Sequence, residues 1–203
     1  FDFGVVMAAT EQCSLCGSYP LKEGETLKLL TLCFPTRSGA NGIEALLGLK
    51  KRGFGVGWWN GFGGKVDPGE TIDQGMVREL QEECGLVAQE YKRRGVLVFK
   101  FKGNQQLYAV HVYEVTRWTG EAQETEEMEP RWWPSDKFPF EHMWPDDELW
   151  CPLLFQTRCE FFTGFAAFPP YEPGTRVVLG HRFAEAEGLD ANGFEWPDFK
   201  TFD

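Results

Sequence analysis

The sequence lacks the features that would place it at a membrane or on a nucleic acid. No run approaches the roughly 18 consecutive apolar residues that a membrane-spanning helix needs. Basic residues are few: 20 Lys and Arg stand against 31 Asp and Glu in 203 residues, a formal net charge of −11. Nucleic-acid polymers and anionic membranes attract clustered Lys and Arg, so we expect neither as a partner. An acidic protein that handles phosphate groups must therefore do so through a metal ion.

The chain also has few cysteines for its length. The six cysteines are spread at a density too low for a disulfide scaffold, and the apolar run at residues 1–10 lacks the preceding basic residues of a signal peptide. We therefore expect a reduced, cytoplasmic protein, with the mitochondrial and nuclear pools left open. Cys13 and Cys16 resemble half of a zinc site, but no second pair follows, so we expect two small side chains in a loose arm.

Apolar residues are numerous enough for one folded domain. Hydrophobic residues make up 42% of the sequence and aromatic residues 15%, which excludes global disorder. We expect an N-terminal arm at residues 1–26, one domain at 27–187, a tail at 188–203, and a monomer. Short β-rich runs predict strands at residues 27–34, 43–49, 95–101, 107–115, 131–133, 161–168 and 176–183.

Two segments predict helices. Residues 71–84 repeat apolar side chains at every fourth position, with Thr71 and Gln74 as a capping box and Gly85 as a left-handed C-cap. Residues 146–156 have helical apolar spacing as well. Strands mixed with two helices predict an α+β fold, in which a mixed sheet is layered with helices.

The first of these helices carries three carboxylates on one face. Glu79, Glu82 and Glu83 stand at i, i+3 and i+4, where like charges repel each other. Arg78 can offset Glu82, but one cation does not neutralise three anions. The pattern is compatible with a solvated acidic surface, or with a hard divalent cation such as Mg²⁺ or Mn²⁺ held through oxygen.

The residues around these carboxylates favour the metal. A pattern of nine constrained positions is met throughout, by Gly64, Glu70, Arg78, Glu79, Leu80, Glu82, Glu83, Gly85 and Leu86. This pattern resembles the Nudix box, the signature of pyrophosphohydrolases that act on nucleoside diphosphates linked to another moiety. The resemblance implies the Nudix fold, a mixed β-sheet sandwiched between α-helices, and hydrolysis by water attack at phosphorus.

The resemblance also implies a role for each residue of the box. Glu79, Glu82 and Glu83 ligate Mg²⁺ or activate water, and the carbonyl of Gly63 joins them at the metal. We expect Glu83 to be the main ligand and leave the general base open between Glu79 and Glu82. The remaining motif residues are expected to be structural: Gly64, Glu70, Arg78 and Gly85.

A further metal ligand is expected in a glutamate-rich run. Residues 121–129 hold five glutamates, which by themselves predict a solvated loop. In the family, a loop carboxylate completes the metal shell. Glu127 is the expected counterpart, with the adjacent Glu126 as the alternative.

Two longer segments narrow the resemblance to one branch of the family. Residues 48–65 and 138–154 resemble the enzymes that hydrolyse oxidised purine nucleoside triphosphates, such as 8-oxo-dGTP and 2-hydroxy-dATP, to the monophosphate and pyrophosphate. The likeness covers about residues 27–187 and implies sanitation of the nucleotide pool. Two departures bear on base preference: Lys28 replaces a small hydroxylated residue, and Tyr108 replaces a methionine.

The chemistry of these segments fits a purine pocket. Trp144 and Phe99 offer flat faces for stacking, and the Asn60 amide can both donate and accept. If Asp146 and Asp147 share an apolar pocket, repulsion and desolvation keep one of them protonated near neutral pH, so the pair can read both oxidised guanine and oxidised adenine. The expected substrate-binding set is Lys50, Phe54, Asn60, Phe99, Trp144, Asp146 and Asp147.

Each of these residues also has a structural interpretation. Trp144 can be a core residue, Asp146 the N-cap of the following helix, and Asn60 the cap of a turn. Two rival functions remain open at this stage. One is hydrolysis of another nucleotide, such as a dinucleotide or a nucleoside-diphosphate sugar. The other is nucleotide binding without catalysis, although three intact glutamates argue against it.

Overall fold

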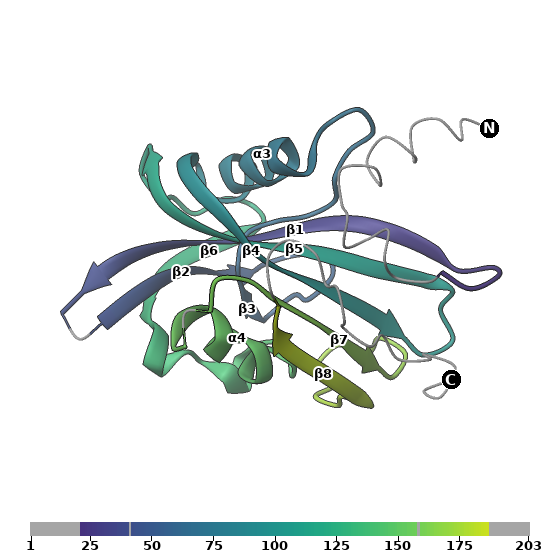
Figure 1. Cartoon of the computed structure of the whole chain (residues 1–203). Helices are drawn as coiled ribbons and strands as arrows, with labels where there is room; N and C mark the ends of the chain where they lie inside the picture. Colours follow the sequence, from purple (N-terminus) through teal and green to yellow (C-terminus); the bar gives the residue numbers. More distant parts are fainter. Residues whose placement is uncertain (1–20, 41, 158, 187–203) are drawn as a thin grey trace.

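The computed structural model describes residues 21–40, 42–157 and 159–186, and within them eight strands form one sheet (Figure 1). The strands are β1 (Thr26–Gly39), β2 (Gly42–Lys50), β3 (Trp59–Asn60), β4 (Val87–Phe101), β5 (Gln106–Thr119), β6 (Met128–Pro134), β7 (Phe162–Phe168) and β8 (Gly180–Glu185). The α-helices are α3 (Ile72–Cys84) and α4 (Asp147–Phe155), and the short 3-10 helices are η1 (Ser135–Lys137) and η2 (Phe140–His142).

The sheet is mixed, as the sequence predicts. Its strand order is β3-β2-β1-β5-β4-β7-β8, with β6 paired to β2. The pairs β1–β5 and β4–β7 are parallel, and the other pairs are antiparallel. β1 pairs with β2 only over Thr36–Gly39, and the earlier part of β1, residues 29–33, bonds instead to the loop before α3. This change of partner brings the Nudix-box loop against the middle of β1.

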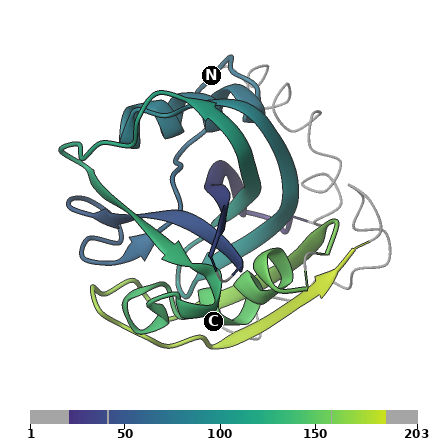
Figure 2. The same ribbon diagram turned by 90° about the vertical axis from the view of Figure 1, so that its left-hand side faces the viewer.

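The two helices cover opposite faces of the sheet (Figures 1 and 2). On one face, α3 buries Ile72, Met76 and Leu80 in a core that includes residues of β1 and β4. On the other face, α4 buries Trp150 and Leu154 in a second core. The predicted sheet between α-helices is therefore confirmed.

The ends of α3 are those that the sequence predicts. The Thr71 hydroxyl accepts from the Gln74 amide, and the Gln74 side chain accepts from the Thr71 amide, which completes the capping box. Gly85 ends the helix with φ of 80°, the left-handed conformation that glycine adopts without steric cost. None of the described helices is long and apolar enough to cross a membrane.

Several strand boundaries differ from the prediction. β1 continues to Gly39 rather than ending at residue 34, β5 continues to Thr119 rather than ending at residue 115, and the short β3 was not predicted. β4 begins at Val87 rather than at residue 95, because irregular pairing with β5 disrupts the alternation that marks a strand. β8 begins at Gly180 rather than at residue 176, and β6 takes the last two residues of the glutamate-rich run. Residues 1–20 and 187–203 lie outside the described residues. The first range holds most of the expected arm, including Cys13 and Cys16, and the second holds the last residue of the expected domain and the whole of the expected tail.

Candidate active site

The loop before α3 approaches β1 more closely than a side chain would allow. Gly63 has φ of 153°, and a Cβ atom on it would lie 2.1 Å from the carbonyl oxygen of Thr31. A Cβ on Gly64 would lie 2.6 Å from the Glu79 carboxyl group. Hydrogen bonds from Thr31 N to Gly64 O and from Cys33 N to Phe62 O fasten the loop to the strand. Glycine is therefore required at position 63, where the close atoms are backbone, whereas a side chain at position 64 would displace the Glu79 carboxyl group.

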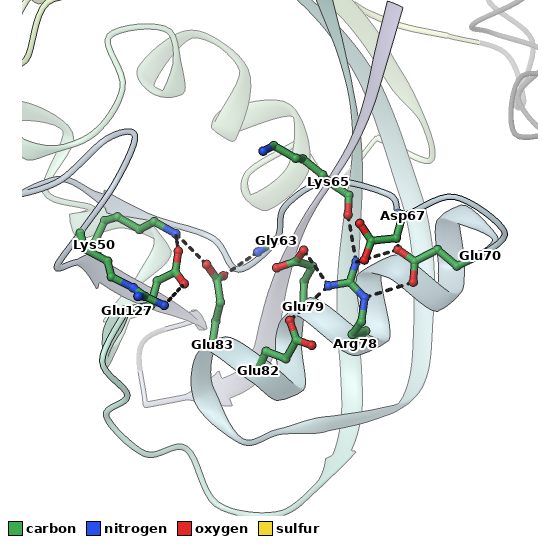
Figure 3. A network of polar contacts seen from close by, with 11 residues as sticks. Lys50, Gly63, Lys65, Asp67, Glu70, Arg78, Glu79, Glu82, Glu83 and Glu127 are labelled. Carbon is green, nitrogen blue, oxygen red and sulfur yellow. Dashed lines mark hydrogen bonds and ion pairs between the residues drawn. The ribbon is translucent and has the colours of Figure 1, made fainter. Parts of the chain in front are cut away.

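Arg78 ties the loop to α3 (Figure 3). Its guanidinium donates two hydrogen bonds to Glu70, at 2.6 and 3.1 Å, and a third to the carbonyl of Lys65 at 2.9 Å. Hydrogen bonding to Arg78 lowers the pKa of Glu70. This geometry agrees with the structural role expected for Glu70 and Arg78, since two parallel bonds fix a carboxylate in direction as well as distance.

The three glutamates of α3 differ in depth. The Glu83 side chain is 3% exposed, that of Glu79 is 16% exposed, and that of Glu82 is 60% exposed. Glu83 accepts from the Gly63 amide at 2.8 Å, which places the deepest carboxylate beside the glycine loop. Glu79 and Glu82 both accept from Arg78, at 2.9 and 3.1 Å.

Lys50, the last residue of β2, joins two carboxylates from different elements (Figure 3). Its Nζ lies 2.8 Å from Glu83 Oε1 and 2.5 Å from Glu127 Oε1. Arg52 also contacts Glu127, whereas the neighbouring Glu126 is exposed. Of the two candidates in the glutamate-rich run, Glu127 is the one that faces the α3 carboxylates.

Burial sets the electrostatics of this centre. Desolvation raises the pKa of Glu83 and of Glu79, although Lys50 and Arg78 respectively oppose it. Burial alone would lower the pKa of Lys50, but the charges of Glu83 and Glu127 outweigh it and raise that pKa. A buried carboxylate is costly without a compensating cation, and basic side chains supply that compensation in this conformation.

The donors available at this centre are all oxygen atoms, which suits a hard divalent cation. Within the described part of the chain, no group of three or more His, Cys, Asp and Glu side chains is already arranged to hold a metal ion. Glu83 and Glu127 instead share the Lys50 ammonium, and Glu79 and Glu82 share Arg78. The donor types fit the expected metal, and its binding requires these carboxylates to turn away from the basic groups.

A cluster of aromatic rings lies beyond Lys50 along the chain. Phe54 stacks on Trp144 with centroids 5.0 Å apart and planes at 26°, and Trp58 meets the same indole edge-on at 4.7 Å. Phe101 lies 5.7 Å from Phe54. Trp144 is only half-buried, so it is not the simple core residue that one interpretation allowed. The cluster presents flat apolar faces of the kind that bind a base.

Asp146 and Asp147 are both buried at the start of α4. The Asp146 carboxyl group accepts from Trp150 Nε1 at 3.1 Å and makes no capping bond, so Asp146 is an N-cap by position only. Asp147 accepts from the Trp144 amide at 3.1 Å, which links it to the aromatic cluster. Burial raises the pKa of Asp146 to about 7, and burial with the nearby Asp146 charge raises the pKa of Asp147 well above its usual range.

Within the described part of the chain, the other residues that the sequence singled out for the base pocket make no hydrogen bond, ion pair or ring contact with the α3 carboxylates or with the Phe54–Trp144 pair. The Asn60 side chain accepts from the amide of Gly61, as the turn-cap interpretation predicts. Phe99 packs edge-on against Phe168, with centroids 5.8 Å apart. Lys28 and Tyr108 are register partners on β1 and β5.

Sequence reasoning missed three rings of the aromatic cluster, those of Trp58, Phe101 and Tyr171. Phe101 stands two residues after Phe99 on β4, so strand alternation would have placed both rings on one face. Tyr171 contacts Phe54 from the loop after β7, at a centroid distance of 4.3 Å. Tyr171 and Phe54 are far apart in the sequence, and no local pattern indicated their contact.

Comparison with known proteins gives relatives over most of the chain. Residues 32–154 match the model of the NUDIX domain family. The sequence is 44% identical to an oxidized purine nucleoside triphosphate hydrolase of Danio rerio over 164 residues, which covers 81% of this chain and 99% of the relative. It is 50% identical to the Mus musculus protein of the same name over 115 residues, which covers 57% and 74% respectively.

A solved structure supports the same fold. The crystal structure of a mutator MutT protein from Bacillus halodurans has a TM-score of 0.64 and 22% identity, and covers 79% of this chain and 99% of that chain. The family model matches more than half of the chain, and the nine box positions stand on the glycine loop and helix just described. This protein therefore belongs to the NUDIX family, as a hydrolase that needs a divalent cation.

Proposed function

We propose that this protein hydrolyses oxidised purine nucleoside triphosphates, of the 8-oxo-dGTP and 2-hydroxy-dATP type, to the monophosphate and pyrophosphate. We propose Mg²⁺ as its cation, with Mn²⁺ able to replace it, and a role in removing damaged nucleotides from the precursor pool. The names of the Danio rerio and Mus musculus relatives support the substrate class. We further propose that it acts as a monomer in the cytoplasm.

The observation that carries the proposal is one short segment that reaches two chemically different centres. Lys50 contacts Glu83 and Glu127, and Phe54, four residues later, stacks on Trp144. Hydrogen bonds from Lys50 N to Trp58 O and from Gly57 N to Lys50 O close this segment into a compact loop. A nucleotide bound along it would have its phosphates at the carboxylates and its base at the aromatic rings.

In the proposed reaction the α3 carboxylates would hold the cation that contacts the phosphates, and one of them accepts a proton. Glu79, Glu82 and Glu83 would hold the cation, which when bound supplies Lewis acidity toward the phosphate oxygens and the attacking water. Glu83 is the main ligand, because its carboxylate is the deepest and is oriented by the Gly63 amide. The water proton passes to Glu79 or Glu82, whichever turns from Arg78 toward the substrate.

At the other end, Asp146 and Asp147 read the base. A carboxyl group that keeps its proton near neutral pH can donate a hydrogen bond, and an ionised one can only accept. With the pKa of Asp146 near 7, the pair can present both patterns to a purine edge. This property supports acceptance of both oxidised guanine and oxidised adenine.

A panel of substrates tests the proposal. The protein is incubated with Mg²⁺ and 8-oxo-dGTP, 2-hydroxy-dATP, dGTP, ADP-ribose or diadenosine polyphosphates, and pyrophosphate and phosphate release are measured. We expect pyrophosphate from the two oxidised nucleotides at a kcat/KM well above that for dGTP. Turnover of only ADP-ribose or the dinucleotides would refute the substrate assignment, and tight binding with no turnover would indicate a non-catalytic module.

A pair of variants tests the assigned metal ligand. Glu83→Gln keeps the size of the side chain but removes its charge, so kcat should fall by at least about a hundredfold while nucleotide affinity changes much less. Glu126→Gln is the matched control, because it removes one glutamate charge at an exposed position near the site. Equal activity of Glu83→Gln and wild type would contradict the assignment.

A further inference from the structure

The loop between β7 and β8, residues 169–179, has no part in the proposed reaction as described above, yet it meets the aromatic cluster. The Tyr171 ring lies 4.3 Å from Phe54, 6.0 Å from Trp144 and 6.2 Å from Phe101, measured between centroids. Tyr171 therefore packs across the stacked Phe54–Trp144 pair and contacts Phe54 most closely.

Tyr171 also bonds to the backbone beside Phe54. Its hydroxyl accepts from the Gly55 amide at 3.0 Å. Gly55 has φ of 82°, and a Cβ atom on it would lie 3.2 Å from the Trp144 indole. The segment that carries Phe54 thus runs close over Trp144, and Tyr171 fixes it there by ring contact and by hydrogen bond.

The other end of the same loop is fastened to the Trp144 side of the cluster. Arg176 Nη1 donates to the carbonyl of Met143 at 2.8 Å and to that of Glu141 at 3.0 Å. The Arg176 charge also acts on Asp147, whose pKa it lowers in part against the effect of burial. The loop therefore connects Trp144 and the aspartates to the Phe54 segment.

The cavity at this place is bounded by the loop itself. Phe101, Trp144, Pro145 and Phe168 line one part of it, and residues 169–172 with Thr175 and Val177 line the rest. The hollow is partly open to solvent and has room for about one water molecule, so no purine fits in it as it stands. Entry of a purine must therefore widen the space at Trp144, and the side formed by Tyr171 and its neighbours is the one built on a loop.

We propose that Tyr171 is a positioning residue of the base site, which forms with Phe54 a two-ring wall that closes on a purine stacked on Trp144. This inference rests on the proposed function, because it requires the aromatic cluster to be the base site. Tyr171 holds Phe54 and Gly55 in place over Trp144, and Arg176 fastens the loop that carries Tyr171 to the carbonyl groups of Glu141 and Met143. The wall adds affinity for the base and leaves the carboxylate chemistry unchanged.

The test compares Tyr171→Ala, Tyr171→Phe and the control Leu179→Ala, which truncates an exposed side chain of the same loop. For 8-oxo-dGTP, we expect Tyr171→Ala to raise KM by roughly 5- to 150-fold, the range of one stacking contact, with kcat within about twofold of wild type. Tyr171→Phe keeps the ring and should retain most of the affinity. Leu179→Ala should match wild type.

A binding measurement separates this inference from the proposed function. Calorimetry with 8-oxo-dGMP reports base recognition without hydrolysis, and Tyr171→Ala should weaken that binding by the factor seen in KM. Because Tyr171 acts through Phe54, Phe54→Ala combined with Tyr171→Ala should weaken binding by less than the product of the single effects.

The outcomes are distinct. An unchanged or lower KM and Kd for Tyr171→Ala would overturn the proposal, and a lower value would identify Tyr171 as an obstacle to entry. A fall in kcat alone would also overturn it, since a base wall acts on binding. If the wild type hydrolyses no oxidised purine triphosphate, the proposed function fails and this inference fails with it.

Discussion

Replacing Asp146 by Asn should remove a pH dependence of folding stability that the wild type shows between about pH 4 and pH 7. Burial raises the pKa of Asp146 from its usual 3.8 to about 7, so the native carboxyl group keeps a proton that the unfolded chain has lost. Stability from this proton is fully present below pH 4 and is lost as pH rises toward 7. At 1.36 kcal/mol per pKa unit, the loss is about 4 kcal/mol.

The assay is urea unfolding followed by tryptophan fluorescence across this pH range. As pH rises from about 4 to about 7, the unfolding free energy of the wild type should fall relative to that of Asp146→Asn by most of that amount. Glu148→Gln is the control, because Glu148 is exposed one residue beyond the buried pair. A difference that stays constant within about 1 kcal/mol from pH 4 to pH 7 would refute the raised pKa.

The same proton should affect base choice. As pH rises through 7, Asp146 loses its proton and with it the ability to donate a hydrogen bond. The ratio of kcat/KM for 8-oxo-dGTP to that for 2-hydroxy-dATP should therefore change across this pH, and Asp147→Asn should alter the ratio while sparing the metal site. A ratio that is flat with pH would count against reading of the base by this pair.

Three further perturbations test the carboxylate centre. Arg78→Lys should destabilise the fold by about 1–3 kcal/mol in urea unfolding, because a point charge cannot replace the two hydrogen bonds to Glu70; stability equal to wild type would contradict the structural role. Gly63→Ala should reduce kcat by more than about tenfold and lower the melting temperature, since its Cβ would lie 2.1 Å from the Thr31 oxygen; wild-type kinetics would refute the close approach. A chelator should abolish turnover and added Mg²⁺ should restore it, and activity that survives chelation would exclude a cation-dependent reaction.

Residue spacing predicts those parts of the fold whose contacts join residues close together in the sequence. The capping box, the apolar stripe and the C-cap glycine of α3 interact within one or two helical turns, so spacing alone identifies them. The extension of β4 to Val87 could not be found in this way. Irregular pairing with β5 leaves residues 89–92 all exposed, and the alternation expected of a half-buried strand disappears.

The candidate site likewise has a part that residue spacing predicts and a part that depends on long-range contacts. The α3 glutamates and Arg78 follow from spacing on one helix, whereas the contacts of Lys50 with Glu83 and Glu127 depend on how β2, α3 and the loop before β6 meet. Tyr171 and Gly55 are separated by 116 positions, and their contact depends on the adjacent course of two loops. Long-range contacts of this kind require the topology of the sheet, which a single sequence does not specify.

The loop from Lys50 to Trp58 gives a physical reason why base recognition and phosphate chemistry should be coupled. Its backbone bonds at Lys50 join the residue that holds Glu83 to the segment that carries Phe54. A substitution that breaks these backbone bonds frees both Lys50 and the Phe54 segment, so contacts at the carboxylates and at the aromatic cluster are lost together. Substitution of Gly57 should therefore change kcat and KM together, whereas truncation of Tyr171, which contacts Phe54 and Gly55 and leaves the backbone bonds at Lys50 in place, should change KM alone.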